Sequence, residues 1–215
     1  VGVPWVGNTA DWLCLMASDP EYVDRLAEIH TAALLRRLEA LYAALGDTID
    51  IFGVDGADFG TQRAELFSPE FFERFYLPFY KVVCGWVHDH TPWKTWKHTC
   101  GSVIHLMPYL TEGGIDCLNP VQCSAAGMDP RTLKREFGDR ITFWGGGVDT
   151  QKTLPFGRPD EVYAEVRERI RIFAPSGGFV FNPVHNIQAN TPPENMEAMF
   201  QALRDYGAYP IRTSS

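Results

Sequence analysis

The sequence lacks an excess of basic side chains, a long apolar run and a leader-like start. Its 215 residues carry 27 acidic and 19 basic side chains, which gives a formal net charge of −8 with His neutral. Nucleic acids and anionic membranes are held by an excess of Lys and Arg, so we expect neither as a partner. No stretch of about 18 apolar residues could span a bilayer, and no basic-then-apolar secretion signal opens the chain. We therefore expect a cytoplasmic protein that acts on a small-molecule substrate.

Cysteine is scarce. The five thiols are odd in number and scattered along the chain: Cys14, Cys84, Cys100, Cys117 and Cys123. A chain of this size with 45% apolar residues can bury a core without disulfide cross-links, so reduced thiols are expected. Thiolate chemistry and metal ligation are therefore open to them.

Prolines mark the starts of helices. In four places a side chain that can accept a hydrogen bond precedes a proline and an apolar-periodic segment follows: Asp19-Pro20, Ser68-Pro69, Asp129-Pro130 and Thr191-Pro192. Such a side chain caps the first turn, and proline at the first helical position gives up an N–H that has no partner there. The predicted helices are 20–45, 69–90, 102–112, 130–137, 159–173 and 192–206.

Short apolar runs lie between these helices and predict strands. They are Ile49–Val54, Thr95–His98, Ile115–Leu118, Ile141–Trp144 and Phe179–Phe181. Continuous apolar strands that alternate with helices indicate a parallel sheet and an α/β fold. No glycine fingerprint of an open dinucleotide-binding sheet follows a first strand, so we favour the closed (β/α)8 barrel.

A complete barrel of this type needs eight strands and about 250 residues. The sequence predicts five strands and a remnant in Val1–Val6. We infer that the first two or three βα units are missing, so that residues 1–215 form a partial barrel of roughly the last five units, with a tail at 208–215. Its active-site loops are expected after the strands, in 119–129 and 145–157.

His98 and Cys100 form a His-x-Cys pair at the end of a predicted strand. Zinc binds imidazole nitrogen and thiolate sulfur, so the pair is a candidate metal site; the alternative is a strand-end histidine beside a packed cysteine. His185 follows the last strand and is a candidate third ligand, although it could instead cap its loop or bind a substrate. Cys123 is a reserve ligand, whereas Cys117 falls within a strand and is expected in the core.

Carboxylates follow two other strands. Asp55 and Asp58 could bind substrate or metal, or could simply satisfy a turn. Asp149 follows three glycines, which allow the backbone to approach a ligand closely.

Several longer motifs together resemble one known family. They are Phe59-Gly-Thr-Gln62 with Ser68-Pro69 and Leu77-Pro-Phe-Tyr80, His98-Thr-Cys-Gly-Ser102, Leu118-Asn-Pro-Val-Gln122, Phe137-Gly-Asp-Arg140, Trp144-Gly-Gly-Gly-Val-Asp-Thr-Gln151 and Asn182-Pro-Val-His-Asn-Ile-Gln188. Over nearly its whole length the chain resembles the uroporphyrinogen decarboxylase superfamily, which also contains zinc-dependent corrinoid methyltransferases.

The resemblance implies a (β/α)8 barrel whose funnel opens at the carboxyl ends of the strands. It also implies that an N-terminal portion is absent. In the decarboxylases that portion holds arginines and the aspartate that grips the pyrrole nitrogens, so this chain alone is not expected to decarboxylate a porphyrinogen. His185 lies where the decarboxylases have a histidine that contacts a substrate carboxylate.

In the methyltransferase branch a His-x-Cys pair and a later cysteine bind zinc, which activates a thiol acceptor toward a corrinoid-bound methyl group. His98 and Cys100 match the pair, and His185 stands where the later cysteine would be. Imidazole also binds zinc but makes the site less electron-rich than a second thiolate would.

The leading hypothesis is zinc-assisted methyl transfer to or from a corrinoid, with zinc on His98, Cys100 and His185. The expected site residues are, for catalysis, Asp58, Gln62, Asp149 and His185, and, for substrate binding, Asp55, Asn119, Gln122, Gln151 and Asn186. A corrinoid protein and a second copy of the chain are the expected partners. The alternatives are a cofactor-free carboxy-lyase of tetrapyrrole metabolism and a non-catalytic binding subunit.

Overall fold

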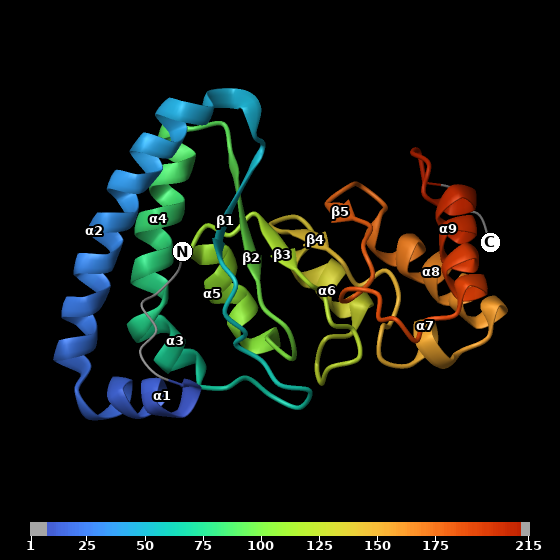
Figure 1. The fold of residues 1–215 in the computed structure, drawn as a ribbon, viewed down its shortest axis with the longest axis horizontal. Helices are drawn as coiled ribbons and strands as arrows, with labels where there is room; N and C mark the ends of the chain where they lie inside the picture. The colour runs from blue at the N-terminus through green and yellow to red at the C-terminus, as the bar shows by residue number, and fades with distance from the viewer. Residues whose placement is uncertain (1–7, 212–215) are drawn as a thin grey trace. The chain divides into compact units, whose positions relative to one another are not determined.

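The computed structural model describes residues 8–211, in which strands alternate with helices (Figure 1). The strands are β1 (Ile51–Asp55), β2 (Lys94–His98), β3 (Cys117–Asn119), β4 (Thr142–Trp144) and β5 (Phe179–Val180). The helices are α1 (Thr9–Ser18), α2 (Pro20–Leu45), α3 (Pro69–Phe75), α4 (Leu77–His90), α5 (Met107–Glu112), α6 (Pro130–Phe137), α7 (Thr153–Phe156), α8 (Pro159–Phe173) and α9 (Pro193–Tyr206), with 3-10 turns η1 (Gly46–Thr48) and η2 (Ile104–Leu106).

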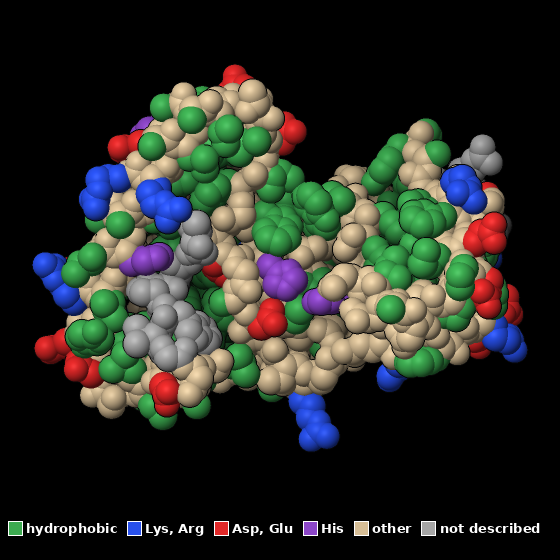
Figure 2. Space-filling model, in the orientation of Figure 1, with side chains coloured by type: hydrophobic (Ala, Val, Ile, Leu, Met, Phe, Trp, Pro, Cys, Tyr) green, Lys and Arg blue, Asp and Glu red, His purple; other side chains and the backbone are tan. Residues whose placement is uncertain are grey.

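Positive and negative side chains are both spread over the face of the molecule drawn in Figure 2. On the face drawn in Figure 2, the Lys and Arg side chains stand singly or in small groups among acidic ones. In the part of the chain that the structure describes, no helix combines the length and the apolar character needed to cross a bilayer.

The chain divides into two compact units. Unit 1 consists of residues 1–57, 67–98 and 105–116, and unit 2 of residues 58–66, 99–104 and 117–215. Each strand of unit 1 is therefore followed by a loop that belongs to unit 2.

Unit 1 packs helices against a parallel pair of strands. β1 pairs with β2 in the register Ile51 to Lys94 and Gly53 to Trp96, and α2 lies beside α4 (Figure 1). The largest fully buried side chains here are aromatic and include Trp12, Trp93 and Tyr80. Burial of this much apolar surface stabilises the unit without cross-links.

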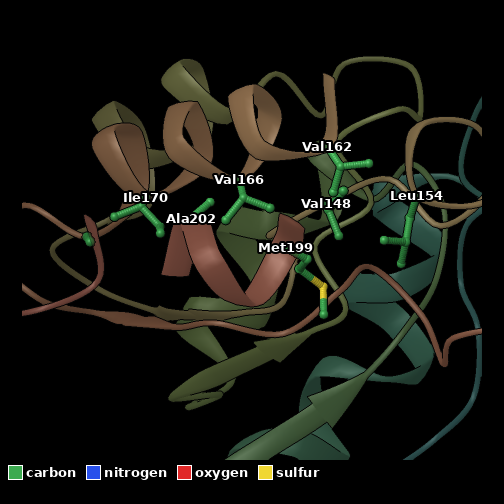
Figure 3. Close-up of a cluster of buried hydrophobic side chains, with 8 residues drawn as sticks. Val148, Leu154, Val162, Val166, Ile170, Met199 and Ala202 are labelled. Atoms are coloured by element: carbon green, nitrogen blue, oxygen red, sulfur yellow. The ribbon is translucent and has the colours of Figure 1, made fainter. Parts of the chain in front are cut away.

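Unit 2 contains the other strands and the helices that follow them. β3 pairs with β4, and β4 with β5, all in parallel. Helices α8 and α9 pack on each other through a buried apolar cluster (Figure 3). Its fully or almost fully buried members are Val148, Leu154, Val162, Val166, Ile170, Ala174, Met199 and Ala202.

Side-chain caps fix the starts of three helices as predicted. Asp19 accepts a hydrogen bond from the Tyr22 amide (3.1 Å), Ser68 from Phe71 (3.3 Å) and Asp129 from Thr132 (2.8 Å). Helices α2, α6 and α8 have the predicted bounds. The five strands predicted between residues 49 and 181 are present, with ends shifted by at most two residues.

The prediction of one helix over 69–90 is wrong, because the segment forms α3 and α4 with a break at Tyr76. Pro78 has no N–H to continue the helical ladder, so a new helix begins at Leu77 with Pro78 in its first turn. The prediction over 102–112 is also too long: Ser102 instead donates its amide to the Thr61 carbonyl (2.7 Å), and the α-helix begins at Met107.

The last helix starts one residue later than predicted. Pro192, in place of Thr191, occupies the extended cap position, with φ −62° and ψ 137°. Helices α1 and α7 were not predicted, and the strand expected in Val1–Val6 lies outside the described residues.

Candidate functional site

Loops that follow all five strands meet in one pocket of unit 2, with a volume of about 370 Å³. Gln62 comes from the segment after β1, Cys100 from that after β2 and Gln122 from that after β3. The remaining lining residues follow β4 and β5: Thr150, Gln151, Val184, His185, Asn186 and Gln188. Residues that the sequence places in loops after the strand ends therefore come together in this pocket, and their chemical roles stay predictions.

The turn that carries Cys100 is fixed by its backbone. The Thr99 amide donates to the Asn119 carbonyl (2.7 Å), and the Thr99 hydroxyl accepts from the Phe59 amide (2.8 Å). Gly101 has φ +85°, and a Cβ there would lie 2.4 Å from the Gly60 carbonyl carbon, so only glycine fits. The thiol is therefore presented by a rigid turn.

Two of the predicted site residues hold this same turn. The Asp58 carboxylate accepts a hydrogen bond from the Cys100 amide (2.8 Å), and the Gln122 side-chain oxygen accepts one from the Gly101 amide (2.8 Å). Gln122 also lines the pocket. Both side chains thus position the thiol-bearing backbone, while their contact with substrate stays a prediction.

Cys100 and His185 offer ligand atoms within 4.8 Å of each other, and both belong to unit 2. His98 ends strand β2 two residues before Cys100, and a span of two residues reaches at most about 7 Å. The chain itself therefore keeps this imidazole within reach of an ion bound at Cys100. A thiolate with imidazoles is a donor set that suits zinc, so the residues fit the metal that the sequence predicts.

Cys123, the reserve ligand, is half-buried. Its thiol lies 3.6 Å from the Val121 carbonyl, and burial raises the pKa of this thiol to about 11. A thiolate is therefore disfavoured there at neutral pH. Cys117 is buried in β3, which confirms its assignment to the core.

Two further predicted residues brace the loops behind the pocket. Asp149 is buried and accepts hydrogen bonds from the Gln151 amide (2.7 Å) and the Lys152 amide (2.9 Å). The Asn119 side chain donates to the Trp144 carbonyl (3.0 Å). Neither lines the pocket, whereas Gln62, Gln151 and Asn186 do. The roles of all five toward a substrate stay predictions.

Asp55 lies in unit 1 and does not line this pocket. Its buried carboxylate pairs with the Lys97 ammonium and accepts a hydrogen bond from the Tyr80 hydroxyl (2.5 Å). Burial, followed by the charge of Asp55, raises the pKa of Tyr80 well above its ordinary value. The structure thus gives Asp55 internal partners, and its predicted role in substrate binding has no support from the pocket.

Sequence reasoning missed Lys97, Thr150 and Gln188. Both Thr150 and Gln188 stand within the family-like motifs: Thr150 lies between the predicted residues Asp149 and Gln151, and Gln188 lies two positions after Asn186. Lys97 directly precedes the His-x-Cys pair, but a lysine in a strand gives no sign that it is buried.

Residues 6–206 match the family model described as uroporphyrinogen decarboxylase (URO-D). The chain belongs to this family. Among curated members, uroporphyrinogen decarboxylase of Dechloromonas aromatica (strain RCB) is 23% identical over 199 residues, and that of Bordetella petrii (strain ATCC BAA-461 / DSM 12804 / CCUG 43448) is 25% identical over 201. Each alignment covers 89% of this chain and 51% of the relative. The chain therefore spans about half the length of these family members.

A solved structure has a similar fold. A methyltransferase from Methanosarcina mazei superposes with a TM-score of 0.67 at 21% identity, over 93% of this chain and 54% of its own. The family resemblance and the α/β class with parallel strands are thus confirmed. Completion of the strands to an eight-stranded barrel stays a prediction.

Proposed function

We propose that this family member takes part in methyl transfer to or from a corrinoid, assisted by a zinc ion on His98, Cys100 and His185. The observation that carries the proposal is the approach of a Cys100 and a His185 ligand atom to within 4.8 Å in the pocket. The similarity of the fold to that of a methyltransferase also supports a methyl-transfer function.

The chain's own residues would organise the site. Asp58 and Gln122 hold the turn of Cys100, so the thiolate is preorganised. Little conformational entropy is therefore lost when it binds a ligand. The amides of Gln62, Gln151 and Gln188 line the same pocket and can orient a substrate through hydrogen bonds. Zinc bound there would supply Lewis acidity that lowers the pKa of a thiol or hydroxyl methyl acceptor.

The lining of the pocket disfavours a polycarboxylate substrate. Among the described residues that line it, there is no Lys or Arg, and the polar groups are carboxamides, a hydroxyl, a thiol and an imidazole. Carboxylates are usually held by Lys or Arg, so an uncharged hydrogen-bonding substrate fits better.

A carboxy-lyase is the second candidate. The curated relatives bear the name uroporphyrinogen decarboxylase, and the exposed His185 side chain at the pocket could contact a carboxylate. In this case no metal is needed, and the two candidates differ in metal content.

The first experiment is elemental analysis of the purified protein and of His98→Ala, Cys100→Ser and His185→Ala. We expect about one zinc per chain in the wild type and loss of most of it in each variant, because each change removes one of three ligands. Cys14→Ser is the matched control, since Cys14 is exposed on α1, outside the pocket, and its loss should leave the zinc content unchanged.

Methyl transfer is then followed by the absorbance change of methylcobalamin with a thiol acceptor. A wild-type protein without metal, or with metal that survives the Cys100→Ser change, contradicts the zinc proposal and favours the lyase.

A further inference from the structure

Lys97 is an unusual residue of unit 1, because its side chain is 0% exposed. Taking an ammonium out of water is costly unless acceptors replace the lost hydration. Lys97 directly precedes the family-like motif His98–Ser102, but neither the sequence nor the pocket gives it a function.

Acceptors surround the Lys97 ammonium. It pairs with the Asp55 carboxylate and donates to the Ala57 carbonyl (2.5 Å) and the His98 carbonyl (2.6 Å). An ammonium has three N–H donors, so three such bonds are enough to use them all. The Tyr80 hydroxyl of α4 donates to Asp55 Oδ2, whereas Lys97 donates to Asp55 Oδ1. Both oxygens of the carboxylate thus have a partner.

The strand places Lys97 and His98 on opposite faces. Side chains alternate along a strand, so Lys97 shares its face with the buried Thr95, which contacts Cys84 of α4. His98 shares the other face with Trp96, whose ring centroid lies 5.9 Å from that of His98. The Lys97 ammonium therefore donates to the His98 carbonyl from the face of the strand opposite the His98 imidazole.

We infer that Lys97 is a positioning residue for the metal ligand His98. By joining the end of β1 at Asp55 and Ala57 to the His98 carbonyl at the end of β2, it fixes the backbone from which the imidazole projects. This inference rests on the proposed zinc site. Groups that orient metal ligands commonly change metal affinity on the order of 10- to 100-fold when they are removed.

The test compares zinc affinity, measured by competition with a chromophoric chelator, in wild type, Lys97→Met and Lys97→Arg. Met removes the donors. Arg keeps the charge beside Asp55, but its planar guanidinium cannot place one nitrogen among the three acceptors. We expect the zinc dissociation constant to rise about 10- to 100-fold in both variants.

Tyr80→Phe is the matched control, because it removes a hydrogen bond to the same Asp55 carboxylate but leaves the bonds of Lys97 in place. It should lower stability and leave zinc affinity within about twofold of the wild type. Cobalt substitution adds a spectroscopic test: the thiolate-to-cobalt and d–d bands should shift in the Lys97 variants and stay in place in Tyr80→Phe.

The outcomes distinguish failure of the proposed function from failure of the inference about Lys97. A wild type that binds no zinc refutes the proposed function and, with it, this role of Lys97. A wild type that binds zinc, with equal affinity in a folded Lys97 variant, overturns the inference alone. If Lys97→Met fails to fold by circular dichroism, the Lys97→Arg comparison decides.

Discussion

At the scale of single residues, buried polar side chains join segments that are distant in the sequence. Asn195 in α9 is 1% exposed, and its side-chain nitrogen donates to the Leu154 carbonyl (2.9 Å) and the Gly157 carbonyl (2.8 Å). It therefore fastens the last helix to the end of α7. Asparagine in a helix is usually solvated, so no local pattern indicates that this one is buried.

Replacing Asn195 with Ala should lower the free energy of unfolding by about 1–3 kcal/mol, because a buried carbonyl and a partly buried one lose a donor. Urea denaturation measures the change. Gln201→Ala on the exposed face of the same helix serves as the control and should have little effect. Equal stability of Asn195→Ala and wild type would show that the two bonds contribute nothing net.

At the scale of elements, the starts of helices depend on single cap residues. The Asp129 carboxylate accepts the Thr132 amide at the start of α6, and this backbone hydrogen bond holds its pKa below the usual range. A carboxyl whose pKa is lowered by folding stabilises the protein above its ordinary pKa and ceases to do so as the pH falls through the lowered value.

Asp129→Ala should therefore cost about 1 kcal/mol of unfolding free energy at neutral pH, and the difference from wild type should shrink in acid. Chemical denaturation at pH 7 and pH 3 tests both statements. Asp139→Ala just beyond the same helix is the control, because that carboxylate is 82% exposed. A difference that persists unchanged at low pH would contradict the capping role.

At the scale of the whole molecule, the core of unit 1 contains acids that resist ionisation. Burial raises the pKa of Tyr76 to about 12 and that of the Cys84 thiol to about 12. The folded protein thus holds these protons at a pH where the unfolded chain releases them. Stability from these groups is fully present below their ordinary pKa values, which are 10.0 and 9.0, and is lost as the pH rises toward 12.

We expect the free energy of unfolding to fall between pH 9 and pH 12, by up to roughly 1.4 kcal/mol per pH unit for each group. Denaturation series at fixed ionic strength measure the slope. Cys84→Ala removes one of the two groups and should give a shallower slope, whatever its effect at pH 7. An identical slope in this variant would show that Cys84 does not contribute.

The sequence alone determined the features that depend on local interactions. An acceptor before a proline located the starts of α2, α3 and α6, and short apolar runs located β1 to β5. The family motifs placed Cys100, Gln62 and His185 in loops after strand ends. These predictions held because a cap, a proline or a strand end acts within a few residues of itself.

Only the tertiary structure decided which polar groups serve the fold and which line the pocket. Asp55 ends β1 and Asp58 lies three residues further on, yet Asp58 accepts the Cys100 amide whereas Asp55 pairs with Lys97. Their partners lie some 40 residues away along the chain. A local pattern cannot specify such a partner, since it is the packing of distant segments that brings the acceptor and the donor together.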